Sequence, residues 1–199
     1  MTCGPPWLPR RPMHFVSDQR SLRSLTLHGC RSDARRGKEF DMTYDSMDFD
    51  CVFRSAKASD YDELRQFIET AWMELYSPHV SKRSVERFQS EDGAGQHLRL
   101  YLATFEVAVV GGSIVGSVNT SGHCITALFV RERYRYNGIG SSLLHNAEIC
   151  GGRYLEVPTF NAPAVSFYER RGWVRGYTTE EESFGTTIGS LVMMKVSGG

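Results

Sequence analysis

The sequence of 199 residues lacks the features that mark several large classes of protein. It has no run of about 20 apolar residues, which a membrane-spanning helix would need. Its formal net charge is zero, which argues against capture of nucleic acid or of an anionic membrane by bulk charge. The five cysteines are odd in number and include no C-x-x-C pair, so neither a disulfide framework nor a zinc site is expected. We therefore expect a cytoplasmic protein with no membrane, nucleic-acid or metal partner.

Residues 1–47 are unlike the rest of the chain. They contain four of the seven prolines and many arginines, without a helical or strand period, so we expect a basic, Pro/Arg-rich, disordered extension. Three interpretations stay open for it: an organelle-targeting segment, a translated upstream region with Met42 or Met47 as the working start, or a basic interaction arm. One ordered domain is expected at residues 48–199.

The remaining pattern predicts a mixed α/β fold. Apolar residues at 3-and-4 spacing follow a capping signal at Ser59 or Asp60, with Asp62 or Glu63 completing the box, and Pro78 ends this helix. Alternating residues around Gly111-Gly112 predict an antiparallel hairpin. The full expectation comprises strands at 51–56, 101–110, 114–119, 124–130, 154–157, 173–178 and 187–196, helices at 64–75, 84–90, 141–150 and 162–171, and loops at Gly93–Gly95 and 179–184.

The stretch Arg-Tyr-Asn-Gly-Ile-Gly at 135–140 lies between a predicted strand and a predicted helix. Free N–H groups at the start of a helix attract an anion, and glycines let the backbone approach it closely. The Walker A loop is excluded because Ser141-Ser142 stands where Lys-Ser/Thr is needed, and the Rossmann pattern because Leu143 replaces the third glycine. The turn therefore predicts an anion site with a different phosphate ligand.

Two motifs follow one another in the sequence: Arg135-x-x-Gly138-x-Gly140, and the run from Asn161 through Phe167-Tyr168-Glu169 to Gly172-Trp173. They resemble, in this order, motifs A and B of the GCN5-related N-acetyltransferase (GNAT) family. The resemblance covers about residues 48–196. It implies a GNAT-type mixed, mostly antiparallel sheet of six to seven strands with helices on both faces.

The resemblance also implies acetyl-CoA as co-substrate, without a metal, and direct attack of a primary amine on the thioester. The pyrophosphate would contact the turn, while pantetheine amides would pair with the strand edge before it and contact the Asn161 side chain. The implied cofactor-binding residues are Phe129, Val130, Arg135, Tyr136, Asn137, Gly138, Ile139, Gly140, Ser141, Asn161 and Phe167. The N–H of Val130 would also stabilise the oxyanion.

The resemblance also supplies candidate catalytic residues. Tyr168 would protonate the leaving thiolate. Glu156, twelve residues earlier, is the candidate base because this spacing resembles the subfamily that acetylates a ribosomal protein N-terminus; His123 or a water chain is the alternative. Other residues carry weaker signals: Trp72, Tyr76, His79 and Glu180–Glu182 would lie near the acceptor, and Cys124 and Cys150 are expected to fill the core.

The acceptor is the least determined part of this prediction. We expect a small-molecule amine, with a protein N-terminus or lysine as the alternative peptide acceptor. A non-catalytic acyl-CoA sensor is the competing hypothesis from another class, and it predicts indifference to Tyr168→Phe. The oligomeric state stays open, with a homodimer among the alternatives.

Overall fold

The computed structural model of the chain describes residues 50–196, so the extension expected at 1–47 lies outside the described residues. Seven strands form one sheet in the order β1-β2-β3-β4-β5-β7-β6, and only the β4–β5 pair is parallel. This confirms the predicted mostly antiparallel mixed sheet. The strands are β1 Cys51–Ser55, β2 Phe105–Val110, β3 Ser113–Ser121, β4 Cys124–Val130, β5 Tyr154–Pro158, β6 Trp173–Ser183 and β7 Thr186–Lys195.

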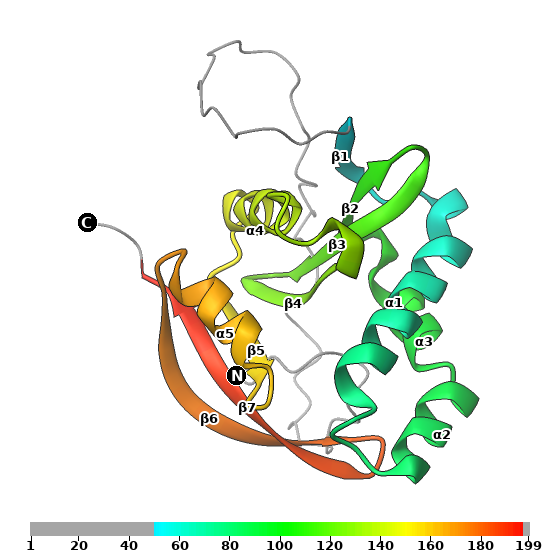
Figure 1. Cartoon of the computed structure of the whole chain (residues 1–199), viewed down its shortest axis with the longest axis vertical. Helices are drawn as coiled ribbons and strands as arrows, with labels where there is room; N and C mark the ends of the chain where they lie inside the picture. The colour runs from blue at the N-terminus through cyan, green and yellow to red at the C-terminus, as the bar shows by residue number, and fades with distance from the viewer. Residues whose placement is uncertain (1–49, 197–199) are drawn as a thin grey trace, which may run out of the picture. The chain divides into compact units, whose positions relative to one another are not determined.

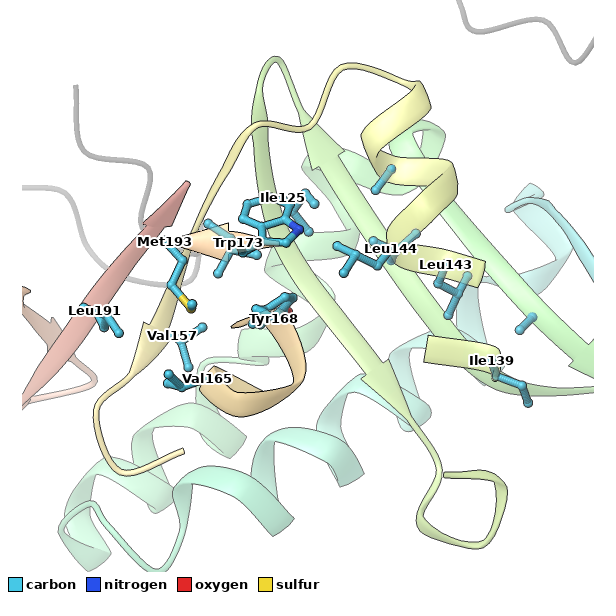
Figure 2. Close-up of a cluster of buried hydrophobic side chains, with 14 of the residues drawn as sticks. Ile125, Ile139, Leu143, Leu144, Val157, Val165, Tyr168, Trp173, Leu191 and Met193 are labelled. Carbon is cyan, nitrogen blue, oxygen red and sulfur yellow. The ribbon is translucent and has the colours of Figure 1, made fainter. Parts of the chain in front are cut away.

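Helices cover both faces of the sheet (Figure 1). One core cluster takes its helical residues from α1, α2 and α3, and the other from α4 and α5 (Figure 2). The α-helices are α1 Tyr61–Tyr76, α2 Lys82–Ser90, α3 Gly93–Tyr101, α4 Ile139–Ile149 and α5 Ala162–Glu169, and short 3-10 turns lie at η1 Ala58–Asp60, η2 Leu102–Thr104 and η3 Glu132–Tyr134. Within residues 50–196, no helix is long and apolar enough to cross a membrane.

The predicted apolar stripe of α1 is confirmed, because Leu64, Ile68 and Trp72 are fully buried. Its predicted capping box is not found. Asp60 is the N-cap residue, but its carboxylate accepts from the backbone N–H of Lys57 at 2.7 Å and pairs with Arg54 at 2.6 Å. The apolar stripe could be predicted from residue spacing alone. The competition of Arg54 and the Lys57 N–H for the Asp60 carboxylate could not.

The loop predicted at Gly93 and Gly95 is wrong, because both residues begin α3. Asp92 adopts a left-handed conformation and its side chain accepts from the Gly95 N–H at 3.2 Å, which caps the helix. A Cβ at Gly93 would lie 2.4 Å from the Phe88 ring. Glycine is needed here for the close approach of α2 and α3, and helix α3 extends to Tyr101, where the sequence predicted strand.

The polar loop predicted at 179–184 is also wrong, because β6 continues to Ser183. The actual turn is the two-residue Phe184-Gly185, with φ of 49° and 94°, and Ser183 pairs with Thr186 across it. Positive φ at both central residues matches the tight hairpin turn that suits twisted strands. The sequence predicted a loop here because Glu180–Glu182 have low strand propensity.

Candidate active site

Strands β4 and β5 run side by side only at their amino ends. Cys124 pairs with Tyr154 and Ile125 with Leu155, and no further pair joins these two strands. Beyond that point β5 continues its pairing with β7, from Tyr154 with Met194 to Pro158 with Ser190. The two strands therefore diverge, and the backbone groups on one edge of β4 are left without a strand partner.

An open cleft lies where the two strands diverge. Its volume is about 500 Å³, which includes the part that is open to solvent. Its walls come from β4 and β5, from the end of α1, and from α5 with the residue before it. The lining residues are Leu75, Tyr76, Ile125, Thr126, Ala127, Leu128, Phe129, Leu155, Glu156, Val157, Pro158, Asn161, Ala164 and Tyr168. The cleft thus brings together Phe129, Glu156, Asn161 and Tyr168 of the predicted site.

Tyr168 lies on α5 among Val157, Val165 and Trp173 (Figure 2). Its side chain is 7% exposed, and burial raises the pKa of its phenol well above the ordinary value. Its hydroxyl forms no hydrogen bond to any described residue. At neutral pH Tyr168 is therefore a neutral phenol that can donate a proton.

Glu156 faces the same cleft from β5, where its backbone pairs with Val192. Its Oε2 atom is buried and has no hydrogen-bond partner among residues 50–196. A buried carboxylate oxygen without a donor is costly, because burial removes water that would otherwise hydrogen-bond to it. A ligand that carries an N–H group would satisfy this oxygen.

The edge of β4 alternates in the direction of its backbone groups. Arg131 donates its N–H to the Val115 carbonyl at 2.8 Å, so the neighbouring Val130 directs its own N–H and C=O away from β3. By the same alternation Leu128 also faces the open edge, whereas Phe129, another lining residue of the cleft, faces β3 with its backbone. Sequence reasoning missed Leu128, whose position could have been read from the two-residue period of the strand.

The glycine turn forms the predicted junction between β4 and α4. Gly138, with φ of 79°, is the N-cap of α4, and Tyr136 also has positive φ, 65°, and a fully exposed side chain. Ser141 donates its N–H to the Gly138 carbonyl at 2.9 Å, which leaves the first N–H groups, those of Ile139 and Gly140, as the helix donors for an anion. Asn137 lies within the turn, where its side chain donates to the Arg135 carbonyl at 3.0 Å.

Two arginines lie at this junction. Arg135 donates from Nε to the Val130 carbonyl at 3.1 Å, and its guanidinium is 3.7 Å from Glu74 of α1. Arg171 donates to the hydroxyl of Ser141 at the start of α4, and its guanidinium lies 3.9 Å from the centre of the Phe167 ring. Sequence reasoning named Arg135 but missed Arg171, because an arginine after a helix carries no positional signal of its own.

Gly140 and Phe167 are in contact across this junction. A Cβ at Gly140 would lie 3.6 Å from Phe167 and from Val130, an ordinary van der Waals distance. The fold therefore does not require glycine at this position. At the neighbouring N-terminus of α5, the Asn161 side chain accepts from the Ala164 N–H at 3.3 Å and thereby caps the helix.

The other sequence candidates divide between the cleft and positions outside it. His123 is exposed at the amino end of β4, where Nδ1 contacts the Gly151 carbonyl at 2.9 Å, and it does not line the cleft. Trp72 is fully buried in the core, and Tyr76 lines the cleft. Cys124 is buried as expected of a core residue, but Cys150, for which the same was expected, is exposed.

His79 and Phe160 extend the cleft wall beyond Tyr76. Their rings stack with centroids 4.0 Å apart, and Phe160 also meets the edge of Tyr76 at 5.7 Å. Glu181 on β6 is close enough to contribute to the raised pKa of Tyr76, although burial is the larger cause. Residues from α1, the β5–α5 connection and β6 thus converge at this end.

A buried polar chain fixes the point at which β4 leaves β5. Ala127 pairs with Asn119 and Ile125 pairs with Thr120, so Thr126 is the extra residue of a β-bulge. The Thr126 hydroxyl donates to the fully buried Asn119 side chain, which donates to the Thr104 hydroxyl at 2.7 Å. Asn119 therefore holds the bulged residue that lines the cleft, a role that no local sequence signal announces.

The tip of the β6–β7 hairpin packs against helices α1 and α2. Phe184 is 4% exposed, and its ring meets Phe88 edge-on at 5.3 Å and Trp72 at 6.0 Å. Thr186 shares a hydrogen bond with the Ser84 hydroxyl at 2.7 Å. The hairpin is thereby anchored to α1 and α2 at the end of the cleft that contains Tyr76.

Comparison with known proteins agrees with this architecture. Residues 96–175, from α3 to the start of β6, match the family model described as an acetyltransferase (GNAT) domain. The match identifies a GNAT acetyltransferase domain over these residues. The matched domain is that of a family of acetyltransferase enzymes that use acetyl-CoA, which favours an acetyltransferase enzyme over the sensor hypothesis.

The individual relatives of this chain are distant. An N-alpha-acetyltransferase of Sulfurisphaera tokodaii is 27% identical, over 71% of this chain and 84% of the relative. Apo YjaB from Escherichia coli has a TM-score of 0.61 at 21% identity, covering 75% of this chain and 99% of that one. The PaiA N-acetyltransferase of Thermoplasma acidophilum, solved with coenzyme A, has a TM-score of 0.59 at 18% identity, covering 74% and 99%. At these identities the structures establish the fold.

Proposed function

We propose that this chain transfers the acetyl group of acetyl-CoA to a primary amine by direct attack within the cleft between β4 and β5. The observation that carries the proposal is the convergence of Glu156, Tyr168 and the unpaired edge of β4 on one cleft. We place this activity in a domain at residues 48–199. The assignment of individual residues below belongs to the same proposal.

The pyrophosphate of acetyl-CoA binds at the start of α4. The N–H groups of Ile139 and Gly140 supply hydrogen bonds, and the helix dipole contributes about 0.3–1 kcal/mol for each nearby charge. Tyr136, Asn137, Gly138 and Ser141 complete the turn around it, with Arg135 and Arg171 as the adjacent cations. Phe167 supports this arrangement through its contact with Arg171.

The pantetheine arm then follows the open edge of β4. Leu128 and Val130 direct backbone groups towards this edge, and Asn161 lies on the opposite wall. A backbone N–H of this edge stabilises the negative oxygen that develops when the amine attacks the thioester carbonyl. One such donor contributes about 3 kcal/mol in well-studied enzymes.

Two proton transfers complete the reaction. The C–N bond forms, the C–S bond breaks, the former amine loses one proton and the thiolate gains one. Glu156 accepts the amine proton, directly or through water, because its Oε2 is buried in the cleft without another donor. Tyr168 donates to the thiolate, because its raised pKa keeps the phenol protonated.

We propose a small-molecule amine as acceptor, and a protein N-terminal amine as the second candidate. The anchored hairpin tip supports the first, since Phe184 and Thr186 tie it to the helices beside the cleft. The name of the Sulfurisphaera relative, an N-alpha-acetyltransferase, supports the second. Lysine side chains of proteins have no comparable support.

A thiol-release assay tests the proposal. Purified protein with acetyl-CoA should release CoA only when an amine is added, with one acetylated amine per CoA by mass spectrometry. The panel comprises small amines, short peptides with a free N-terminus, and the same peptides with a blocked N-terminus and one lysine. Glu156→Gln should lower kcat about 100-fold. Failure of every amine to promote CoA release would refute the proposal.

A further inference from the structure

The cleft has an unbalanced set of ionisable groups. Its described lining residues include the carboxylate of Glu156 and the phenols of Tyr76 and Tyr168, but no lysine, arginine or histidine. A second carboxylate, Glu181, acts electrostatically on Tyr76 at the same end. The described lining residues therefore offer a carboxylate at Glu156 and no basic side chain.

The cations that follow β4 are engaged elsewhere. Arg131 donates from Nε to the Ile114 carbonyl at 2.7 Å and lies over the Phe67 ring. Arg135 is held by the Val130 carbonyl and Glu74, at the turn that precedes α4. Neither belongs to the set of residues that line the cleft.

A free amino acid would bring its own carboxylate into this space. When its amine approaches Glu156, the carboxylate on the adjacent carbon must also enter the cleft, close to a like charge and partly removed from water. Burial strengthens the repulsion between like charges, and an unpaired buried carboxylate loses its hydration as well. An acceptor with a neutral group in the same position avoids both costs.

We propose that the acceptor of this enzyme is a primary amine without a carboxylate on the carbon next to the amine, which excludes free α-amino acids. The inference rests on the proposed acetyl transfer to an amine. It covers alkylamines and amines beside an amide or hydroxyl group. The part of the cleft lining that the structure describes supplies Glu156 for the amine and no basic side chain for a carboxylate.

A matched series of acceptors tests the inference with the full-length protein. Alanine and alaninol share their carbon skeleton and have amines of similar basicity, but only alanine carries a carboxylate. Alaninamide and a short peptide amide that begins with alanine represent peptide-like acceptors, and isopropylamine represents alkylamines. We expect kcat/KM for alaninol to exceed that for alanine at least about 100-fold. The rates with the two amide acceptors, compared with the rate with isopropylamine, distinguish a peptide-like amine from an alkylamine as the acceptor.

The variant Glu156→Gln links the discrimination to the cleft charge. It should lower kcat/KM for both acceptors but reduce the alaninol-to-alanine ratio at least about tenfold. Glu86→Gln is the matched control, because Glu86 is exposed on α2 and outside the cleft, and the ratio should not change. Alanine accepted within threefold of alaninol would overturn the inference while leaving the proposed function intact. No acetylation of any amine would overturn the proposed function, and the inference with it.

Discussion

The two halves of the cleft are built in different ways. The half assigned to CoA comes from β4, the turn before α4, and α5, so most of its residues lie within residues 128–171 of the chain. The acceptor half joins α1 and α2 to the tip of the β6–β7 hairpin, with Ser84 bonded to Thr186. The residues of the first half lie close together in the sequence and carry the family motifs. The second half joins segments about a hundred residues apart.

The largest expected effect is a loss of stability in a variant of the acceptor half. Phe184→Ala removes a buried ring from the contact with Trp72 and Phe88, so unfolding free energy should fall by about 3–5 kcal/mol. In the folded fraction, KM for the amine should rise more than KM for acetyl-CoA. Urea unfolding and steady-state kinetics measure the two effects. Tyr177→Ala, which removes an exposed aromatic side chain from β6, is the control, and a selective rise in KM for acetyl-CoA would contradict the comparison.

Tyr168→Phe should lower kcat about 100-fold, equivalent to about 2.7 kcal/mol, because it removes the proposed proton donor and keeps the ring. The Kd of CoA, measured by calorimetry, should stay within about twofold. Tyr154→Phe is the matched control, since Tyr154 lies at the paired end of β5 and outside the cleft. An unchanged kcat in Tyr168→Phe would remove Tyr168 from the mechanism.

Much of the CoA half could be predicted from sequence, and the reason is locality. The turn at Gly138, the helix caps and strand β4 depend on neighbouring residues, so their patterns survive in a single sequence. The start of α3 was missed because its glycines serve the contact with Phe88. Strand β6 was cut short because its polar residues pair with β7, a partner that sequence alone does not place.

The candidate site shows the same division. Glu156 and Tyr168 were found together because a family spacing connects them, and the structure places both on the cleft. Arg171, Leu128 and the Asn119–Thr126 contact were missed because each acts across elements.

The helical layer should also respond to acid. His97 on α3 is fully buried, and this burial lowers the pKa of its imidazole to about 3 from 6.5. The unfolded chain therefore binds a proton below pH 6.5 that the folded chain does not bind until about pH 3. Stability should fall by up to about 1.4 kcal/mol for each pH unit in this window.

Urea titrations at pH 7, 6 and 5 measure this slope. His97→Gln should flatten it, whereas His145→Gln should leave it unchanged because His145 is exposed. A slope that persists in His97→Gln would show that other groups dominate the acid response.

The smallest expected effect concerns the CoA half alone. Gly140→Ala should raise the Kd of CoA about tenfold, near 1.4 kcal/mol, because the added methyl group occupies the approach to the N–H donors. Stability should be unchanged or rise by about 0.5–1 kcal/mol, since the site accommodates a Cβ and alanine favours helix.

Gly138→Ala is the contrasting variant for this position. Gly138 has positive φ, so alanine there should cost about 1–2 kcal/mol of stability. Thermal unfolding and calorimetry measure both variants. Equal loss of stability in the two would contradict the assignment of Gly140 to ligand approach.

The most direct test of the central claim, direct transfer within one cleft, is the initial-rate pattern with both substrates varied, measured alongside the intact mass of enzyme incubated with acetyl-CoA alone. The account predicts intersecting double-reciprocal lines and no acetylated enzyme, because amine and thioester must occupy the cleft together. Parallel lines with an acetyl group on the enzyme would contradict it.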